Sequence, residues 1–182
     1  MKLVDILSSL EDDDSMHLAR LLVLLRAFVG HDQSKTVNGL TKLVKLDFLL
    51  RYPVYLERAL RYVGASLADA RVMDHERKSV ESSMIRYHYG PWDPRYRRFV
   101  NLLIGKGLVK VSFQGQTIKI SLTEKGIQKA IALSEDENFQ GLSYRAEILK
   151  RHFDMGATRL KDFIYEAFPE ISSLRLGEEI KI

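Results

Sequence analysis

The sequence contains no cysteine, so the fold holds no disulfide bond and no thiolate ligand for a metal ion. It also lacks a long apolar run, because the longest, residues 21–25, is far shorter than the roughly 20 residues that span a bilayer. The first residues, MKLVDILSSLEDDDS, have a weakly basic start and an acidic exit, which is untypical of a signal peptide. We therefore expect a cytoplasmic protein that does not act at a membrane.

Sequence patterns that carry catalysis are also missing. The chain has no Walker-type glycine loop and no GxSxG elbow, and its five histidines form neither an HxH nor an HExxH pair. Asp47 and Glu57 stand too far apart to indicate a two-carboxylate site, and the tripeptide Asp74-His75-Glu76 is isolated in a polar stretch. We expect no catalytic residue, no metal site and no cofactor, and a protein that is not an enzyme.

Charge is unevenly distributed along this chain, whose formal net charge is +4. Residues 1–14 carry one lysine and five acids, whereas residues 86–110 carry six basic residues and a single acid, Asp93. Such asymmetry can mark an electropositive face that attracts phosphate backbones. It can equally belong to a solvated surface that acids elsewhere in the fold balance, and the charge pattern does not decide between the two.

Apolar spacing, together with glycine and proline, predicts a mainly helical chain. In the helix expected over 40–52, which Pro53 ends, Lys42, Lys45 and Arg51 should point away from the apolar face. Residues 1–14 are expected to form an acidic arm, either a short separate helix or a partly ordered segment, residues 65–82 a polar inserted loop and residues 134–141 a polar linker. Further helices are expected from the cap Ser15 to Gly30, over 53–63, over 124–133, from the cap Ser143 to Gly156, and from the cap Thr158 to Pro169.

The stretch from Arg86 to Leu122 is the most informative part of the chain. A helix is expected to begin at Pro94, with Asp93 as its N-cap, and to end at Gly107. Two alternating strands follow, LVKVSF and TIKISL, joined by a turn at residues 114–116. The inward stripe of the helix is expected to be Tyr96, Phe99, Val100 and Leu103.

A helix followed by a β-hairpin matches the recognition helix and wing of a winged helix-turn-helix. The expected fold is therefore mainly α with a small β-hairpin, with a winged helix-turn-helix core over 15–134 and additional C-terminal helices over 135–182. If the unit binds duplex DNA, the contacting residues would be Arg95, Arg97, Arg98 and Asn101 on the helix and Lys110 and Lys119 on the hairpin.

A protein-docking role for the same unit stays open. Leu102 lies on the same side of the helix as Arg95 and Arg98, and an apolar residue there suits a partner surface better than a DNA groove. The nearby aromatic residues could stack on bases, but packing within the fold is the favoured interpretation of their role. They are Tyr87, His88, Tyr89, Trp92 and Tyr96.

Three segments resemble the small middle component of bacterial ABC-three-component systems, a group to which the accessory subunit of Lamassu-type antiphage systems is similar. They are LTKLVKLDFLLRYP (40–53), RYHYGPWDPRYRRFVNLLIGKGLV (86–109) and LKDFIYEAFPEI (160–171). The resemblance implies a non-catalytic winged-helix subunit of an antiviral defence complex, encoded beside an SMC-like ABC ATPase and a toxic effector, often a nuclease. Such a subunit would bridge the two proteins and could contact double-stranded DNA.

On this reading the partner interface would use apolar side chains of the helices and of the aromatic cluster. The candidates are Tyr89, Trp92, Leu102, Phe163, Tyr165 and Phe168. Two alternatives remain: a stand-alone winged-helix transcription regulator that uses the same helix on DNA, and an antitoxin that neutralises a toxin by direct binding.

Overall fold

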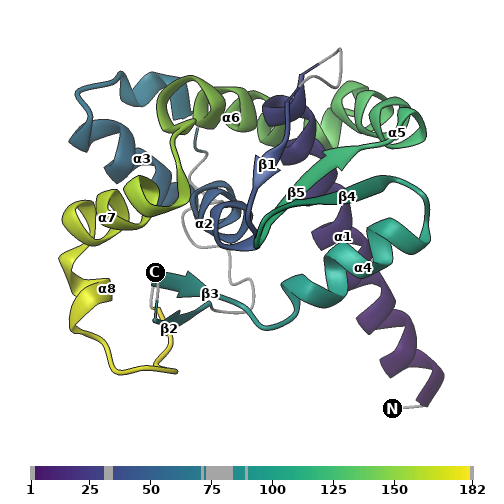
Figure 1. Ribbon diagram of the computed structural model, residues 1–182, viewed down its shortest axis with the longest axis horizontal. Helices are drawn as coiled ribbons and strands as arrows, with labels where there is room; N and C mark the ends of the chain where they lie inside the picture. Colours follow the sequence, from purple (N-terminus) through teal and green to yellow (C-terminus); the bar gives the residue numbers. More distant parts are fainter. Residues whose placement is uncertain (1–2, 31–34, 71, 73–83, 89, 181–182) are drawn as a thin grey trace.

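The longest helix, α1 (Leu3–Val29), begins at the lower right of Figure 1 and runs upward behind the three-stranded sheet. The computed structural model describes residues 3–30, 35–70, 72, 84–88 and 90–180. Residues 21–25 of α1 are buried on all sides, as is typical of a helix that is apolar around its circumference. The expected start of this helix at Ser15 is wrong, because the helix already begins at Leu3. Residues 3–14 contain neither glycine nor proline, and an existing helix extends easily because each added residue contributes one further hydrogen bond.

The predicted hairpin is confirmed and belongs to a three-stranded antiparallel sheet. Strands β4 (Val109–Gln114) and β5 (Thr117–Leu122) pair from Val109 opposite Leu122 to Gln114 opposite Thr117. A short strand, β1 (Val37–Asn38), lies beside β5, which gives the order β1-β5-β4. The inner end of the hairpin is buried, but Phe113 near its tip is 73% exposed, so the tip projects from the body.

Helices α2 (Leu40–Arg51) and α3 (Pro53–Tyr62) confirm the two helices expected around Pro53, which begins α3. A short 3-10 helix, η1 (Leu67–Ala70), lies in the predicted inserted loop, and residues 71 and 73–83 of that loop lie outside the described residues. The α3, α7 and α8 helices flank α2 on one side, whereas α1, α4, α5 and the three-stranded sheet lie on the other (Figure 1).

A second, two-stranded sheet was not predicted. Strands β2 (Ile85–Tyr87) and β3 (Gly90–Trp92) form an antiparallel pair that is too short to show alternation in the sequence. Residues 177–180 extend this pair along β2. The Arg86 amide donates to the carbonyl of Glu178 at 2.8 Å, the Gly177 amide donates to the carbonyl of Arg86 at 2.8 Å, and Ile85 forms a bridge with Glu179.

Helix α4 (Tyr96–Gly105) begins two residues later than expected, after a turn in which Asp93 Oδ1 accepts from the backbone N–H of Arg95 at 2.9 Å. The polar linker expected over 134–141 is wrong, because α6 (Glu137–Phe153) already begins there, capped by Asp136. The remaining helices are α5 (Glu124–Glu135), α7 (Ala157–Ala167) and α8 (Pro169–Ser173).

The chain is therefore mainly helical with a small antiparallel sheet. Within the part of the chain that the structure describes, none of the helices has the length and apolar character needed to cross a membrane.

The close approach of α5 to the hairpin gives a testable prediction. A Cβ added at Gly126 would lie 1.9 Å from the carbonyl oxygen of Leu108, a backbone atom that cannot move aside alone. We expect Gly126→Ala to lower the free energy of unfolding by about 2 kcal/mol or more, as overpacking does. The matched control is Gly141→Ala in α6, where a Cβ meets nothing within 4 Å, and there we expect a gain of roughly 0.5–1 kcal/mol. Urea denaturation measures both; equal effects of the two variants would contradict the tight contact.

Candidate functional site

The exposed face of α4 carries the candidate DNA-binding residues of the helix. Tyr96, Phe99, Val100 and Leu103 are buried as predicted, which turns Arg97, Arg98 and Asn101 toward solvent. Leu102 is half-buried and packs against the core, so it offers a partner less apolar surface than its sequence position indicated.

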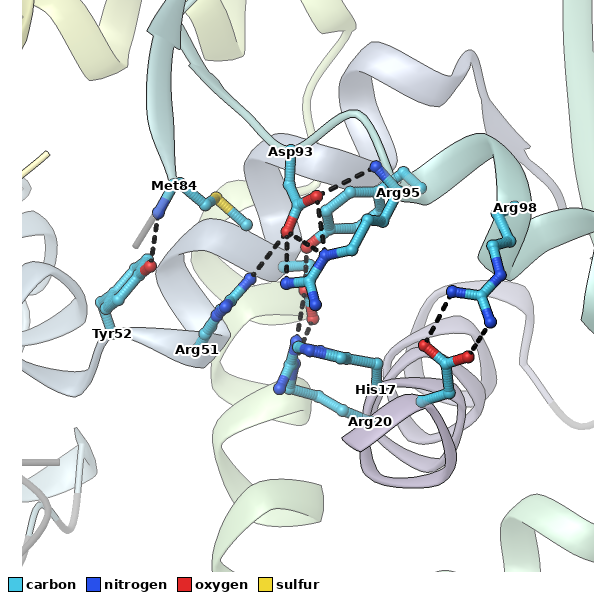
Figure 2. A network of polar contacts seen from close by, with 11 residues as sticks. His17, Arg20, Arg51, Tyr52, Met84, Asp93, Arg95 and Arg98 are labelled. Carbon is cyan, nitrogen blue, oxygen red and sulfur yellow. Dashed lines mark hydrogen bonds and ion pairs between the residues drawn. The ribbon is translucent and has the colours of Figure 1, made fainter. Parts of the chain in front are cut away.

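Two of the three arginines on this face are bound to carboxylates. The Arg95 guanidinium forms an ion pair with Asp93, with 2.8 Å between Nη2 and Oδ2. Arg98 pairs with Asp14 of α1, with 3.3 Å between Nη1 and Oδ1 of the weaker of its two contacts (Figure 2). Arg97 is exposed, and none of the described residues forms a hydrogen bond or ion pair with it. The basic strip of the sequence is thus partly neutralised within the fold.

The hairpin lysines share one face of the sheet. Lys110 lies opposite Ser121, and Lys119 lies opposite both Ser112 and Asn38 on its two neighbouring strands. Lys110 is exposed, whereas Lys119 is half-buried in the central strand. Of these two lysines, Lys110 is therefore the better placed for contact with a phosphate.

A further basic surface was missed in the sequence. Lys106 at the end of α4 and Lys125 and Lys129 on α5 line an open hollow of about 550 Å³ beside the base of the hairpin. The Lys125 ammonium donates to the carbonyl of Lys106 at 3.0 Å, which holds the two segments together. Lys125 and Lys129 are one helical turn apart, and that spacing was the only signal available for this surface.

The candidate partner residues separate into core and surface. Phe168 is fully buried and Phe163 nearly so, in an aromatic cluster with Tyr55, and this takes both out of the candidate partner surface. Trp92 and Tyr165 are half-buried, and the Tyr165 hydroxyl lies 3.4 Å from the carbonyl oxygen of His88. Tyr89 lies outside the described residues.

Behind α4 lies a buried polar network that the sequence did not reveal (Figure 2). Asp47 on α2 is fully buried and receives two hydrogen bonds from Arg20 of α1, at 2.8 Å from Nε and 3.1 Å from Nη2. The Tyr96 hydroxyl of α4 donates to the same carboxylate. Arg20 Nη2 also lies 2.7 Å from Nδ1 of His17, whose ring stacks on Phe99. One carboxylate thus joins three helices.

The electrostatics around the network shift the pKa values of Tyr96 and Asp93. Burial, followed by the charge of Asp47, raises the pKa of the Tyr96 hydroxyl well above its ordinary value, so the phenol stays a neutral donor. Burial would raise the pKa of the Asp93 carboxyl, but hydrogen bonds from Arg95 and the charges of Arg95 and Arg51 outweigh it and lower that pKa. Asp93 therefore stays ionised and joins Arg51, whose Nη1 lies 3.4 Å away, to the start of α4.

Lys45 is the most unusual charged residue in the structure. The expectation that Lys42, Lys45 and Arg51 point away from the core is wrong, because all three are buried where α2 is covered on every side. Lys42 and Arg51 reach carboxylates, Asp154 at 2.9 Å and Asp93 at 3.4 Å. Lys45 is 1% exposed, and no described residue accepts a hydrogen bond from its ammonium. Burial, reinforced by the nearby charge of Lys161, lowers the pKa of Lys45 to about 8.

Comparison with known proteins adds no relative. No protein-family model matches the chain, and neither a curated protein nor a solved structure does. Among the residues that the structure describes, no three or more His, Asp and Glu side chains are grouped so as to hold a metal ion. Asp74-His75-Glu76 lies outside the described residues.

The shared carboxylate predicts a large loss of stability when it is neutralised. We expect Asp47→Asn to lower the free energy of unfolding by roughly 3–5 kcal/mol, because the substitution breaks a buried ion pair by neutralising one partner. Arg98→Ala is the control, since the Arg98 side chain is 61% exposed, and its loss should cost less than about 1 kcal/mol. Urea denaturation with a check on the m-value measures both. A loss at Asp47 no larger than that at Arg98 would show that the network contributes nothing beyond a surface pair.

Lys45 predicts a stability that depends on pH. Its pKa is lower in the folded chain than in the unfolded chain, so the unfolded chain binds more protons between about pH 8 and 10.5 and stability rises across that window. We expect Lys45→Met to raise the free energy of unfolding by about 2–3 kcal/mol at pH 7, a gain that fades as the pH rises through the window. Tyrosines that titrate in the same pH window are present in both proteins, so their effect cancels when the free energies of unfolding of variant and wild type are subtracted.

Lys42→Met, three residues earlier on the same helix, removes a lysine that is paired with Asp154 and should show no such gain. A stability difference between Lys45→Met and wild type that stays constant from pH 7 to pH 11 would contradict the lowered pKa.

Proposed function

We propose that residues 15–134 form a winged-helix domain and that the chain is a non-catalytic accessory subunit of an SMC-type ABC-ATPase antiphage complex. In that complex it bridges the ATPase and an effector, which we take to be a nuclease. The partners come from the resemblance of residues 40–53, 86–109 and 160–171 to the middle component of ABC-three-component systems. The observation that carries the fold part is the order of the elements around the three-stranded sheet.

In a winged helix, a first strand between the first two helices pairs with the last strand of the wing. Here β1 follows α1, precedes α2 and lies beside β5, and the wing strand β4 lies at the outer edge. Helix α4 directly precedes the wing and takes the place of the recognition helix. On this reading the segment from α3 to β3, residues 53–92, is an insertion between the second and third helices of the domain.

Exposed apolar side chains support docking on a partner. Phe113 at the hairpin tip is 73% exposed and Ile104 on α4 is 41% exposed, and large apolar residues in such positions are typical of contact surfaces. The first turns of α1 extend past α4 and away from the rest of the molecule (Figure 1). Phe113 and Ile104 therefore replace Phe163 and Phe168 as our candidate partner surface.

Contact with double-stranded DNA, if the complex makes it, falls on a smaller set of residues than the sequence indicated. Arg98 is paired with Asp14 of α1, whose carboxylate neutralises the arginine and disfavours a phosphate there. The unpaired Arg97 and the hollow lined by Lys106, Lys125 and Lys129 carry no such acid among the described lining residues. We therefore assign phosphate contact to these four side chains.

The test is co-expression of the chain with the SMC-like ABC ATPase that the proposal places beside it, followed by capture on a tag on the ATPase. We expect the wild type to co-purify and Phe113→Asp to be lost from the complex at least about tenfold, because a charge would be buried at the interface. Arg151→Gln is the control, since it changes one exposed charge on α6, far along the chain from the hairpin. Circular dichroism verifies that the variants are folded.

A wild-type chain that never co-purifies with the ATPase would contradict the proposal. If the isolated chain instead bound one duplex sequence, with an affinity that falls steeply as salt rises, it would be a stand-alone regulator. Capture of a neighbouring toxin without the ATPase would point to an antitoxin.

A further inference from the structure

A pocket of about 450 Å³ opens between α2, the β2–β3 pair and the start of α4, away from the hollow beside the hairpin. Lys45 and Thr41 of α2 form one side of it, and Tyr87, Pro91 and Trp92 form another. Its size falls in the range of about 300–1,000 Å³ in which small-molecule sites are found. Of the residues that line this pocket, the proposed function uses only Arg97.

The described residues that line the pocket include two cations, Lys45 and Arg97, and no acid. Lys45 is 1% exposed, and no described residue accepts a hydrogen bond from it. The charge that acts on Lys45 is that of another cation, Lys161 on α7. A buried lysine in such surroundings lowers stability, and an anion seated in the pocket would remove that penalty.

The Lys45 side chain packs beside the start of β3. Gly90 begins that strand with a φ of +104°, and a Cβ there would lie 3.7 Å from Cε of Lys45 and 3.9 Å from Ile164, which is ordinary van der Waals contact. The positive φ, rather than a lack of space, therefore favours glycine at this position. The end of the Lys45 side chain and Gly90 thus lie together in the wall of the pocket.

The opposite side of the pocket is aromatic. The Trp92 and Tyr87 rings stack with 5.9 Å between centroids and 27° between planes, and Pro91 and Pro94 line the pocket beside them. Because Trp92 and Tyr87 both line the pocket, a flat ring bound there can contact this aromatic pair, and stacking on an aromatic side chain is worth about 1–3 kcal/mol for a nucleobase. The two sides thus recognise a negative charge and a planar ring at the same time.

We propose that this pocket binds a nucleoside monophosphate unit, with its phosphate on Lys45 and Arg97 and its base against Trp92. A phosphate monoester suits two cations better than a carboxylate because it carries nearly two negative charges at pH 7 and has three acceptor oxygens. The unit can be a free mononucleotide or the 5′ end of a nucleic acid strand, since both present the same groups.

Trp92 is the only tryptophan in the chain, so its fluorescence reports directly on this pocket. The wild-type protein is titrated with a nucleoside 5′-monophosphate, the matching nucleoside, inorganic phosphate and N-acetylphenylalanine, which carries a ring and a carboxylate. We expect saturable quenching by the monophosphate and at least about tenfold weaker binding of the nucleoside, which lacks the charge-assisted hydrogen bonds. Affinity should also fall above about pH 8, as Lys45 loses its proton beside Lys161 and Arg97.

Variants separate binding from folding. Lys45→Met should weaken monophosphate binding by roughly 10- to 100-fold, and Arg97→Gln by about fivefold. Arg97 is exposed, so Arg97→Gln should fold normally. It therefore still tests the phosphate site if Lys45→Met does not fold. Arg151→Gln removes one positive charge outside the pocket and should leave affinity unchanged.

A 5′-phosphorylated oligonucleotide, compared with its 5′-hydroxyl form, distinguishes a strand end from a free nucleotide. The proposal is overturned if no monophosphate quenches Trp92 saturably, or if Lys45→Met and Arg97→Gln both bind as tightly as wild type. Tighter binding of N-acetylphenylalanine than of the monophosphate would also overturn it and would assign the pocket to an acidic peptide. None of these outcomes depends on the ATPase, so failure here is distinct from failure of the proposed function.

Discussion

The carboxylate of Asp47 is the point on which the arrangement of the helices depends. It lies at full burial between α1 and α4, where Arg20 and Tyr96 supply the hydrogen bonds that an ionised group needs away from water. Apolar packing alone tolerates small rotations of one helix against another, but a bidentate ion pair fixes their register. A second carboxylate, Asp93, continues the constraint to the first turn of α4. The exposed face of that helix is therefore oriented by charges at its back.

Much of the architecture could be predicted where local sequence signals are strong. Pro53 separates two helices, the stripe from Tyr96 to Leu103 is buried, and the two alternating strands form the hairpin. The failures occur where the determining contact is distant or the element is short. Strand β1 has two residues and β2 and β3 have three each, too few for a period to appear, and their pairing depends on partners far along the chain.

The candidate site was harder to predict because a sequence does not show which charges meet. Arg98 and Asp14 are 84 positions apart, yet their pairing removes much of the positive charge expected on α4. Lys45 posed the opposite problem. A lysine between apolar helical residues suggests a side chain that turns to solvent, but α2 is covered on all sides, so the lysine had no outward direction to take. The burial of Lys45 becomes apparent only when the elements that pack around α2 are known.

The pairing of residues 177–180 with β2 has a thermodynamic consequence. The segment between α3 and α4 is long, and closing so long a loop is entropically unfavourable unless contacts far along the chain secure it. The Arg86 amide donates to the Glu178 carbonyl and the Ile180 amide donates to the Met84 carbonyl, and these hydrogen bonds hold the loop closed. The Met84 amide also donates to the Tyr52 hydroxyl at 2.8 Å. Opening of residues 177–180 would therefore free β2 and the wall it forms, so these parts of the chain should exchange their amide hydrogens as one cooperative unit.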